Sequence, residues 1–371
     1  MKSIAYAGLD VHKDKIVVVI MPEKGEGPIC ERSLRNDSLE VKKFFVRWDK
    51  LFELRCCYEA SSCGYVVHRW LKAIGIACEV VAPSLVPHRS GDRIKTDRRD
   101  ALKLARLYRA GELVSVHVPT EEDESVRSLV RCREVLNKEV QQSRHYILKF
   151  LSVRGLTYGE GSNWTQKHWN YLRRLKFEGP DAITWGEYLA LLEYKLSRLE
   201  EVERRVEEVA KTESYMGSVG ILRCLRGIDT LSAMVLLTEI QDFGRFGRAR
   251  QVMSYLGLVP SEDSSGGRRR QGGITKTGNS RCRRVLIQAA WHYAHKPALS
   301  KCLKERQGGQ PPAVIAHSWK AQHRLHKKFW GIALRNDRRK AVVAVSRELV
   351  GFIWALMTQY DDRTDPRVVG A

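Results

Sequence analysis

Residues 4–21, IAYAGLDVHKDKIVVVIM, decide the fold of the first part of the chain. Two apolar, β-branched runs, IAYAGLDV and KIVVVIM, flank a short polar turn, and this pattern predicts two adjacent strands. Asp10 stands at the end of the first run. A carboxylate in that position is a candidate functional residue, with an ordinary turn residue as the alternative.

Strand and helix patterns continue outward from this stretch to about residue 115. They predict a third strand around 29–34, helices over 37–53, 64–74 and 96–110, and buried strands over 54–61 and 77–82. The order β-β-β-α-β-α-β-α is typical of an α/β domain in which helices cover a mixed sheet.

Two long amphipathic patterns follow, over 123–152 and 189–209. Their three- and four-residue spacing predicts long helices that form a coiled-coil arm. Pairing of arms between protomers and a hairpin within one chain are equally compatible with it. We expect three domains, 1–115, 116–214 and 215–371, the last of them mostly helical.

The charge is uneven along the 371 residues. The formal net charge is +21, and residues 265–345 hold 19 Lys and Arg against two acidic residues. Because like charges repel in a folded protein, this excess indicates a surface that binds nucleic acid phosphates. No apolar run is long enough to span a bilayer, and Asp10 comes too early for a signal peptide. Nine cysteines without a Cys-x-x-Cys pair indicate reduced cytosolic thiols.

Four carboxylates of the first domain form the first candidate site. Besides Asp10, Glu59 ends the strand CCYEAS, and Asp97 and Asp100 are three residues apart at a helix start, so they share a face. In an RNase H-like fold, the first strand, the fourth strand and the last helix meet at one edge. Four bare carboxylates there would repel each other, and Mg²⁺ ions would neutralise them and orient a phosphodiester.

Each acid also has a simpler explanation. Asp97 or Asp100 could cap the helix and Glu59 could form a salt bridge. Asp14 and Asp92 are further acids nearby.

The second candidate site is the glycine-flanked stretch Ser264-Ser265-Gly266-Gly267 followed by three arginines. A serine hydroxyl there can approach a phosphate as a nucleophile, and neighbouring arginines can stabilise the charge that develops. A flexible turn is the alternative. Before it, residues 221–257 resemble a helix-hairpin-helix, with Asp229 where a second glycine is usual. The basic candidates for phosphate contact are Arg268, Arg269, Arg270, Lys276, Arg283 and Arg284.

Four motifs, GLDVHKDK, CYEASSCGY, KTDRRDALKLARL and YLGLVPSEDSSGGRRRQGGITKTGNSRCRRVL, resemble in this order those of the DEDD transposases of bacterial insertion sequences. The resemblance is to the insertion sequence 110 family of RNA-guided recombinases and covers roughly residues 4–115 and 215–295. It implies a RuvC-like, RNase H-type domain with the tetrad Asp10, Glu59, Asp97 and Asp100. It also implies a transposase domain whose serine forms a covalent link to DNA; Ser265 matches best and Ser264 is the near alternative.

The resemblance further implies partners. A structured guide RNA, the bridge RNA, would choose donor and target DNA, and the protein would work as a homo-oligomer, a dimer or tetramer, at the bacterial nucleoid. We therefore expect an RNA-guided, magnesium-dependent DNA recombinase. Two alternatives remain: a metal-only nuclease of the Holliday-junction type, and a non-catalytic nucleic-acid-binding protein.

Overall fold

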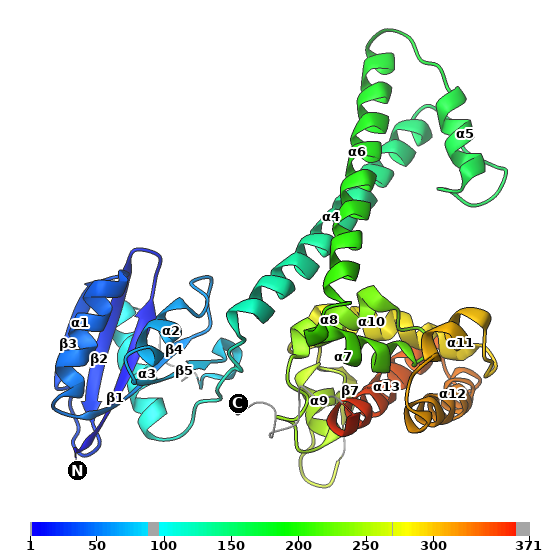
Figure 1. Ribbon diagram of the computed structural model, residues 1–371. Helices are drawn as coiled ribbons and strands as arrows, with labels where there is room; N and C mark the ends of the chain where they lie inside the picture. The colour runs from blue at the N-terminus through cyan, green and yellow to red at the C-terminus, as the bar shows by residue number, and fades with distance from the viewer. Residues whose placement is uncertain (1, 88–95, 269, 361–371) are drawn as a thin grey trace. The chain divides into compact units, whose positions relative to one another are not determined.

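The computed structural model describes residues 2–87, 96–268 and 270–360, and the chain divides into two compact units, 1–119 and 120–371. In the first unit, five strands form one sheet in the order β3-β2-β1-β4-β5 (Figure 1). β1 is antiparallel to β2 and parallel to β4. The strands are β1 (Ile4–Val11), β2 (Lys15–Pro22), β3 (Cys30–Arg35), β4 (Glu53–Glu59) and β5 (Ala77–Val81). The predicted mixed α/β architecture is confirmed.

Helices cover both faces of this sheet. They are α1 (Ser38–Asp49), α2 (Val66–Lys72) and α3 (Asp97–Arg109), with a 3₁₀ turn η1 (Pro83–Leu85) after β5. Alternate residues of β1 point to opposite faces. Ala7 and Leu9 share an apolar core with α1 and α2, whereas Gly8 lies against α3. A Cβ on Gly8 would stand 2.1 Å from the carbonyl oxygen of Ala101, so glycine is what allows α3 to lie directly on β1.

The predicted ends of these elements agree with the structure to within a few residues. Asp37 caps the start of α1: its side chain accepts hydrogen bonds of 3.0 Å from the backbone N–H groups of Leu39 and Glu40. Such a cap satisfies donors that a helix start otherwise leaves unpaired.

In the second unit, α4 (Glu121–Ser152) and α6 (Gly179–Val209) pack along each other, with α5 (Gln166–Arg174) between them in the chain (Figure 1). Lys195 of α6 pairs with Glu139 of α4 at 2.9 Å. The two long helices therefore form a hairpin within the chain. Pairing between protomers stays a prediction.

The rest of the second unit is mostly helical, as predicted. Its elements are α7 (Glu213–Arg223), α8 (Thr230–Ile240), α9 (Ala249–Tyr255), α10 (Ser280–Trp291), η2 (His292–Ala294), α11 (Lys301–Gln307), α12 (Pro312–Ala333) and α13 (Arg338–Tyr360). Among the described residues, α13 alone is long and apolar enough to cross a membrane. Its buried residues pack into the core that these helices share.

A short hairpin of β6 (Pro260–Glu262) and β7 (Gln271–Ile274) interrupts the helices. The sequence did not indicate these strands, because the segment is rich in glycine, serine and arginine. We call residues 260–274 the serine hairpin.

Candidate active site

The end of β1 and the end of β4 place two carboxylates on one face of the sheet. Leu9 and Tyr58 are register partners on these parallel strands, and Asp10 and Glu59 are the residues that follow them. Cys57, two residues before Glu59, contacts the backbone of α3 through its thiol, 3.7 Å from the Leu104 oxygen. Because side chains alternate along a strand, Asp10 and Glu59 share the face covered by α3.

The first turn of α3 adds the other two carboxylates. Thr96 caps this helix and accepts a hydrogen bond of 3.3 Å from the backbone N–H of Arg99. Asp97 and Asp100 follow in the first turn. Thr96 is thus the side-chain cap, and neither aspartate is needed for that role.

Asp10 and Asp97 meet around a histidine that the sequence analysis missed. His12 Nε2 lies 3.1 Å from Asp10 Oδ2 and 3.5 Å from Asp97 Oδ1. One ligand atom from each of these three residues lies within 4.8 Å of the other two. Lys15 adds an ammonium group, with its Nζ 2.6 Å from Asp97 Oδ2. The signal was the polar run His-Lys-Asp-Lys at 12–15, which begins two residues after Asp10.

Electrostatics distinguishes the two aspartates. Burial raises the pKa of Asp10, and the negative charges of Asp97 and Asp100 raise it further, against the lowering effect of His12. The Lys15 ammonium lowers the pKa of Asp97 through its hydrogen bond. The charge of Asp10 is therefore poorly compensated in the folded protein.

This donor set fits a divalent cation. Carboxylate oxygens are the ligands of hard cations such as Mg²⁺, and a cation would offset the repulsion that raises the pKa of Asp10. The structure joins Asp10 and Asp97 directly, brings Asp100 within electrostatic reach of Asp10, and puts Glu59 on the neighbouring strand. Of the further acids, Asp92 lies outside the described residues.

The serine hairpin presents Ser265 at its tip. Arg268 N donates to Ser265 O at 3.1 Å, and between them Gly266 and Gly267 have φ of 56° and 81°. These left-handed angles are those of a tight type I′ turn. Among the described residues, no group hydrogen-bonds to the Ser265 hydroxyl.

The neighbouring serine is engaged instead. The Ser264 hydroxyl donates to Glu262 Oε1 at 3.0 Å and accepts from Arg270 N at 3.2 Å. Of the two candidate nucleophiles, Ser265 thus has the free hydroxyl in the described chain. The predicted phosphate contact Arg269 lies outside the described residues.

Two of the predicted basic contacts have structural partners. Arg283 donates to the carbonyl oxygens of Leu256 and Thr277, at 2.9 and 2.6 Å, so it joins the two ends of the loop that carries the serine hairpin. Arg284 pairs with the buried Glu134 of α4. Arg268, Arg270 and Lys276 lie exposed on the loop, and none of them forms a side-chain ion pair with another described residue.

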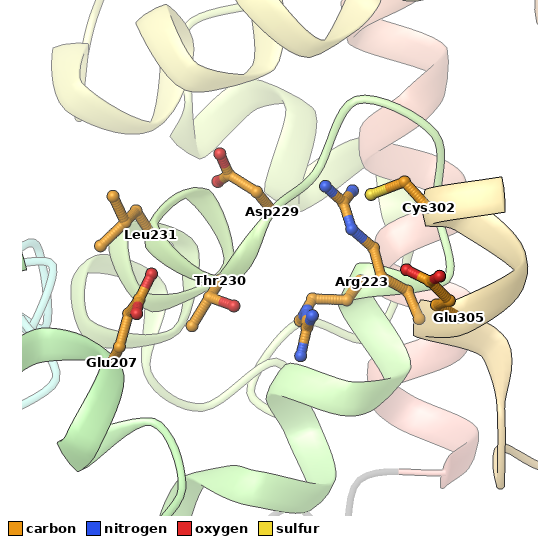
Figure 2. Close-up of a pocket in the computed structure, with 8 residues that line it drawn as sticks. Glu207, Arg223, Asp229, Thr230, Leu231, Cys302 and Glu305 are labelled. Atoms are coloured by element: carbon orange, nitrogen blue, oxygen red, sulfur yellow. The ribbon is translucent and has the colours of Figure 1, made fainter. Parts of the chain in front are cut away.

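A cavity of about 330 Å³ lies beside the start of α8 in the second unit (Figure 2). Its lining residues are Glu207, Arg223, Asp229, Thr230, Leu231, Cys302, Glu305 and Arg306. Asp229 caps α8 by accepting a hydrogen bond of 2.8 Å from Ser232 N. The lining has mixed charge, with Arg223 and Arg306 beside three carboxylates, so phosphate binding by this hairpin stays a prediction.

All nine cysteines are free thiols, as the sequence predicted. Burial raises the pKa of Cys56 and of Cys57 well above the usual value, so both stay protonated.

Comparison with known proteins gives matches over most of the chain. The model of the Transposase IS116/IS110/IS902 family matches residues 219–304, and a DEDD transposase model of the IS110 group matches residues 7–153. The putative transposase y4qE of Sinorhizobium fredii is 36% identical over 358 residues, which is 95% of this chain and 88% of that protein. The transposase for insertion sequence element IS1533 of Leptospira borgpetersenii is 34% identical over 89% of this chain and 96% of its own length.

Proposed function

Since this chain belongs to the IS110 family of insertion-sequence transposases, enzymes that cut and join DNA, we propose that it is a site-specific recombinase with two chemical centres. One is the acidic cluster at the start of α3, and the other is the Ser265 hydroxyl. The observation that carries the proposal is the meeting of Asp10 and Asp97, 87 positions apart in the chain, around one potential cation position. The family implies an RNase H-like fold and a divalent metal.

We propose Mg²⁺ as that metal, with Asp10, Glu59, Asp97 and Asp100 as the residues that hold it. When bound, the metal would supply Lewis-acid stabilisation of phosphate charge. His12 positions the Asp10 carboxylate, and Lys15 holds Asp97 through its ammonium.

Ser265 is our proposed nucleophile. Its Oγ forms a bond to the phosphorus of the scissile phosphodiester, its proton leaves, and a deoxyribose oxygen departs and takes a proton. Reversal of this step by the hydroxyl of another strand joins that strand and frees the serine. The supporting observation is its free hydroxyl at the tip of a tight turn, next to Arg268 and Arg270. Arg268 and Arg270, on the same hairpin, are the residues that we propose stabilise the charge on phosphate.

A second candidate is a metal-only nuclease of the Holliday-junction type. It is favoured by one observation: the acidic cluster is built entirely from residues of the first unit, and Ser265 belongs to the other unit. Hydrolysis would then need no serine.

The partners in this proposal are donor and target DNA, a structured bridge RNA and a second copy of the chain. The basic segment 265–345 supports binding of nucleic acid. Action on chromosomal DNA places the protein in the bacterial cytoplasm, at the nucleoid.

The deciding experiment traps a protein–DNA adduct on a denaturing gel, with RNA that copurifies with the protein and with Mg²⁺ present. Wild type and Ser264→Ala should form the adduct, and Ser265→Ala should form none while binding DNA normally. Asp10→Ala and Asp97→Ala should also abolish cleavage. Cleavage without any adduct, unchanged in Ser265→Ala, would establish the hydrolytic nuclease instead.

A further inference from the structure

The far end of the helical hairpin differs in charge from its shaft. Residues 144–178, which we call the arm tip, hold seven Lys and Arg against two acidic residues. The shaft, residues 121–143 and 179–210, holds eight Lys and Arg against 14 acidic residues. A basic tip on an acidic shaft is complementary to a polyanion that contacts the tip alone.

The arm tip also gathers five aromatic rings, contributed by Tyr158, Trp164, His168, Trp169 and Tyr171. The Trp164 ring is 5.1 Å from that of His168 and 6.1 Å from that of Trp169, centroid to centroid. Both tryptophans are partly exposed. An arginine lies over each: Arg144 is 5.2 Å from the Trp164 centroid and Arg173 is 5.4 Å from that of Trp169.

The cluster holds Trp164 in a strained backbone conformation. Trp164 has φ of 67°, in the left-handed region that bulky residues avoid. Its backbone N–H donates to His168 Nδ1 at 2.9 Å, which anchors it there. Strain of this kind persists where the surrounding structure imposes it, and it is concentrated at binding sites.

Buried polar atoms in the cluster lack partners. His168 is fully buried, and its Nε2 has no hydrogen-bond partner in the described part of the chain. The Tyr158 hydroxyl and Arg144 Nε are likewise buried atoms without a hydrogen-bond partner among the described residues. Burial lowers the pKa of His168, which favours a neutral ring whose Nε2 carries the proton, because Nδ1 accepts from Trp164. A packed core alone does not account for this set, since buried donors are normally paired.

We propose that the arm tip binds unpaired nucleotides of the DNA that this transposase cuts. Bases stack on Trp164 and Trp169, and the arginines and lysines around them contact phosphates. Unpaired DNA is the fitting ligand because a ring reaches a base face only where the bases are unstacked, and cutting and joining strands exposes such bases. The proposal rests on the transposase activity and adds to it a contact outside both chemical centres.

Crosslinking of the full-length protein to a 20-nucleotide single strand that contains 5-iododeoxyuridine locates the contact. Trypsin would release the arm-tip peptides 155–167 and 168–173, which carry Trp164 and Trp169. We expect DNA adducts on both. Adducts confined to peptides of the basic segment 265–345 would overturn the proposal.

Variants separate stacking from folding. Trp164→Gly removes the ring and fits the left-handed backbone, so the tip keeps its fold while the yield of arm-tip crosslink falls about tenfold at subsaturating DNA. Trp164→Phe keeps an aromatic ring and should retain most of the crosslink yield. Arg174→Ala with Lys176→Ala should lower the yield severalfold, and the matched control Arg198→Ala, exposed on the shaft, should not.

Competing ligands identify the nucleic acid. Unlabelled single-stranded DNA should displace the probe from the tip, and duplex DNA of the same sequence should not. Stronger displacement by single-stranded RNA would overturn the assignment to DNA. Ser265→Ala and Asp10→Ala should leave the arm-tip adducts unchanged, so a failure of the proposed chemistry and a failure of this contact are distinguishable.

Discussion

The guanidinium of Arg131 donates two hydrogen bonds, of 2.7 and 2.8 Å, to the buried carboxylate of Glu239. Arg131 lies on α4 of the arm and Glu239 near the end of α8. The same carboxylate accepts from Asn279 Nδ2 at 2.6 Å, and Asn279 caps α10, directly after the loop that carries the serine hairpin. One carboxylate thus links the arm, the helical core and the segment that positions Ser265.

Glu239→Ala should destabilise the second unit by about 3–5 kcal/mol, because it leaves Arg131 and Asn279 without their buried partner. Glu239→Gln keeps a hydrogen-bond acceptor and the shape of the side chain, so it should lose less stability. Denaturant unfolding followed by circular dichroism measures both. Arg204→Ala, which breaks exposed pairs on the arm, is the control and should change little. A loss for Glu239→Ala no larger than that of the control would contradict the role of this carboxylate.

The pairing of Glu239 with Arg131 predicts that the stability of the protein depends on pH. Burial alone would raise the pKa of Glu239, but hydrogen bonds and charge from Arg131, with help from Asn279 and Arg281, lower it below its ordinary 4.5. A carboxyl with a lowered folded-state pKa stabilises the protein above its unfolded pKa, and this contribution is lost as the pH falls through the lower value. The stability gap between wild type and Glu239→Gln should therefore be largest near neutral pH and shrink below 4.5. A stability difference between wild type and Glu239→Gln that is constant from pH 7 to pH 3 would be evidence against a lowered pKa of Glu239.

The strands and helices of the first unit could be predicted well because the residues that determine each element lie within that element or next to it in the sequence. Period-two apolar runs give the strands, and Asp37 lies beside the helix that it caps. The acids Asp10, Glu59, Asp97 and Asp100 could be chosen because each ends a strand or begins a helix. The pairing of Glu239 with Arg131 joins residues 108 positions apart, and no spacing rule in the sequence indicates it.

The site was less predictable where one residue type serves several purposes. His12 was missed because a histidine in a polar turn is ordinary until the fold brings Asp97 beside it. Arg283 was assigned to phosphate from its basic surroundings; the structure adds that its Nη1 donates to backbone carbonyls, and the phosphate contact stays a prediction. Charge counts along a chain do not separate these two uses of arginine.

Gly8→Ala should disrupt the acidic cluster from a distance. The new methyl group would meet the Ala101 oxygen at 2.1 Å and the Ala105 nitrogen at 2.5 Å, so α3 must move away from β1. We expect a loss of at least about 2 kcal/mol in stability. We also expect the loss of Mg²⁺-dependent cleavage, because α3 carries Asp97. Gly27→Ala, with open space around it in the same unit, is the control. Normal cleavage by Gly8→Ala would show that the position of α3 is unimportant.

Gly266→Ala and Gly267→Ala should slow adduct formation without weakening DNA binding. Neither new methyl group would touch another atom, so the cost comes from the left-handed backbone alone, about 1–2 kcal/mol for each residue. Gly266→Asn should be tolerated better, since asparagine adopts this conformation. Gly273→Ala, in the same hairpin but without a positive φ, provides the comparison. Equal rates of adduct formation in Gly266→Ala and Gly273→Ala would show that the turn conformation is not needed for the reaction of Ser265.

Asp10→Asn should make the metal-free protein more stable and deprive it of its response to magnesium. Burial and the charges of Asp97 and Asp100 raise the pKa of Asp10, so its ionised form costs the folded state free energy at neutral pH, and the neutral amide avoids that cost. For the wild type, magnesium at ten times its dissociation constant should add about 1.4 kcal/mol of stability. Thermal unfolding with and without Mg²⁺ measures both effects. The nearby exposed acid provides the control, Asp14→Asn, which should behave as the wild type does. If Asp10→Asn gains as much stability from magnesium as the wild type, the ion binds elsewhere and the acidic cluster is not its site.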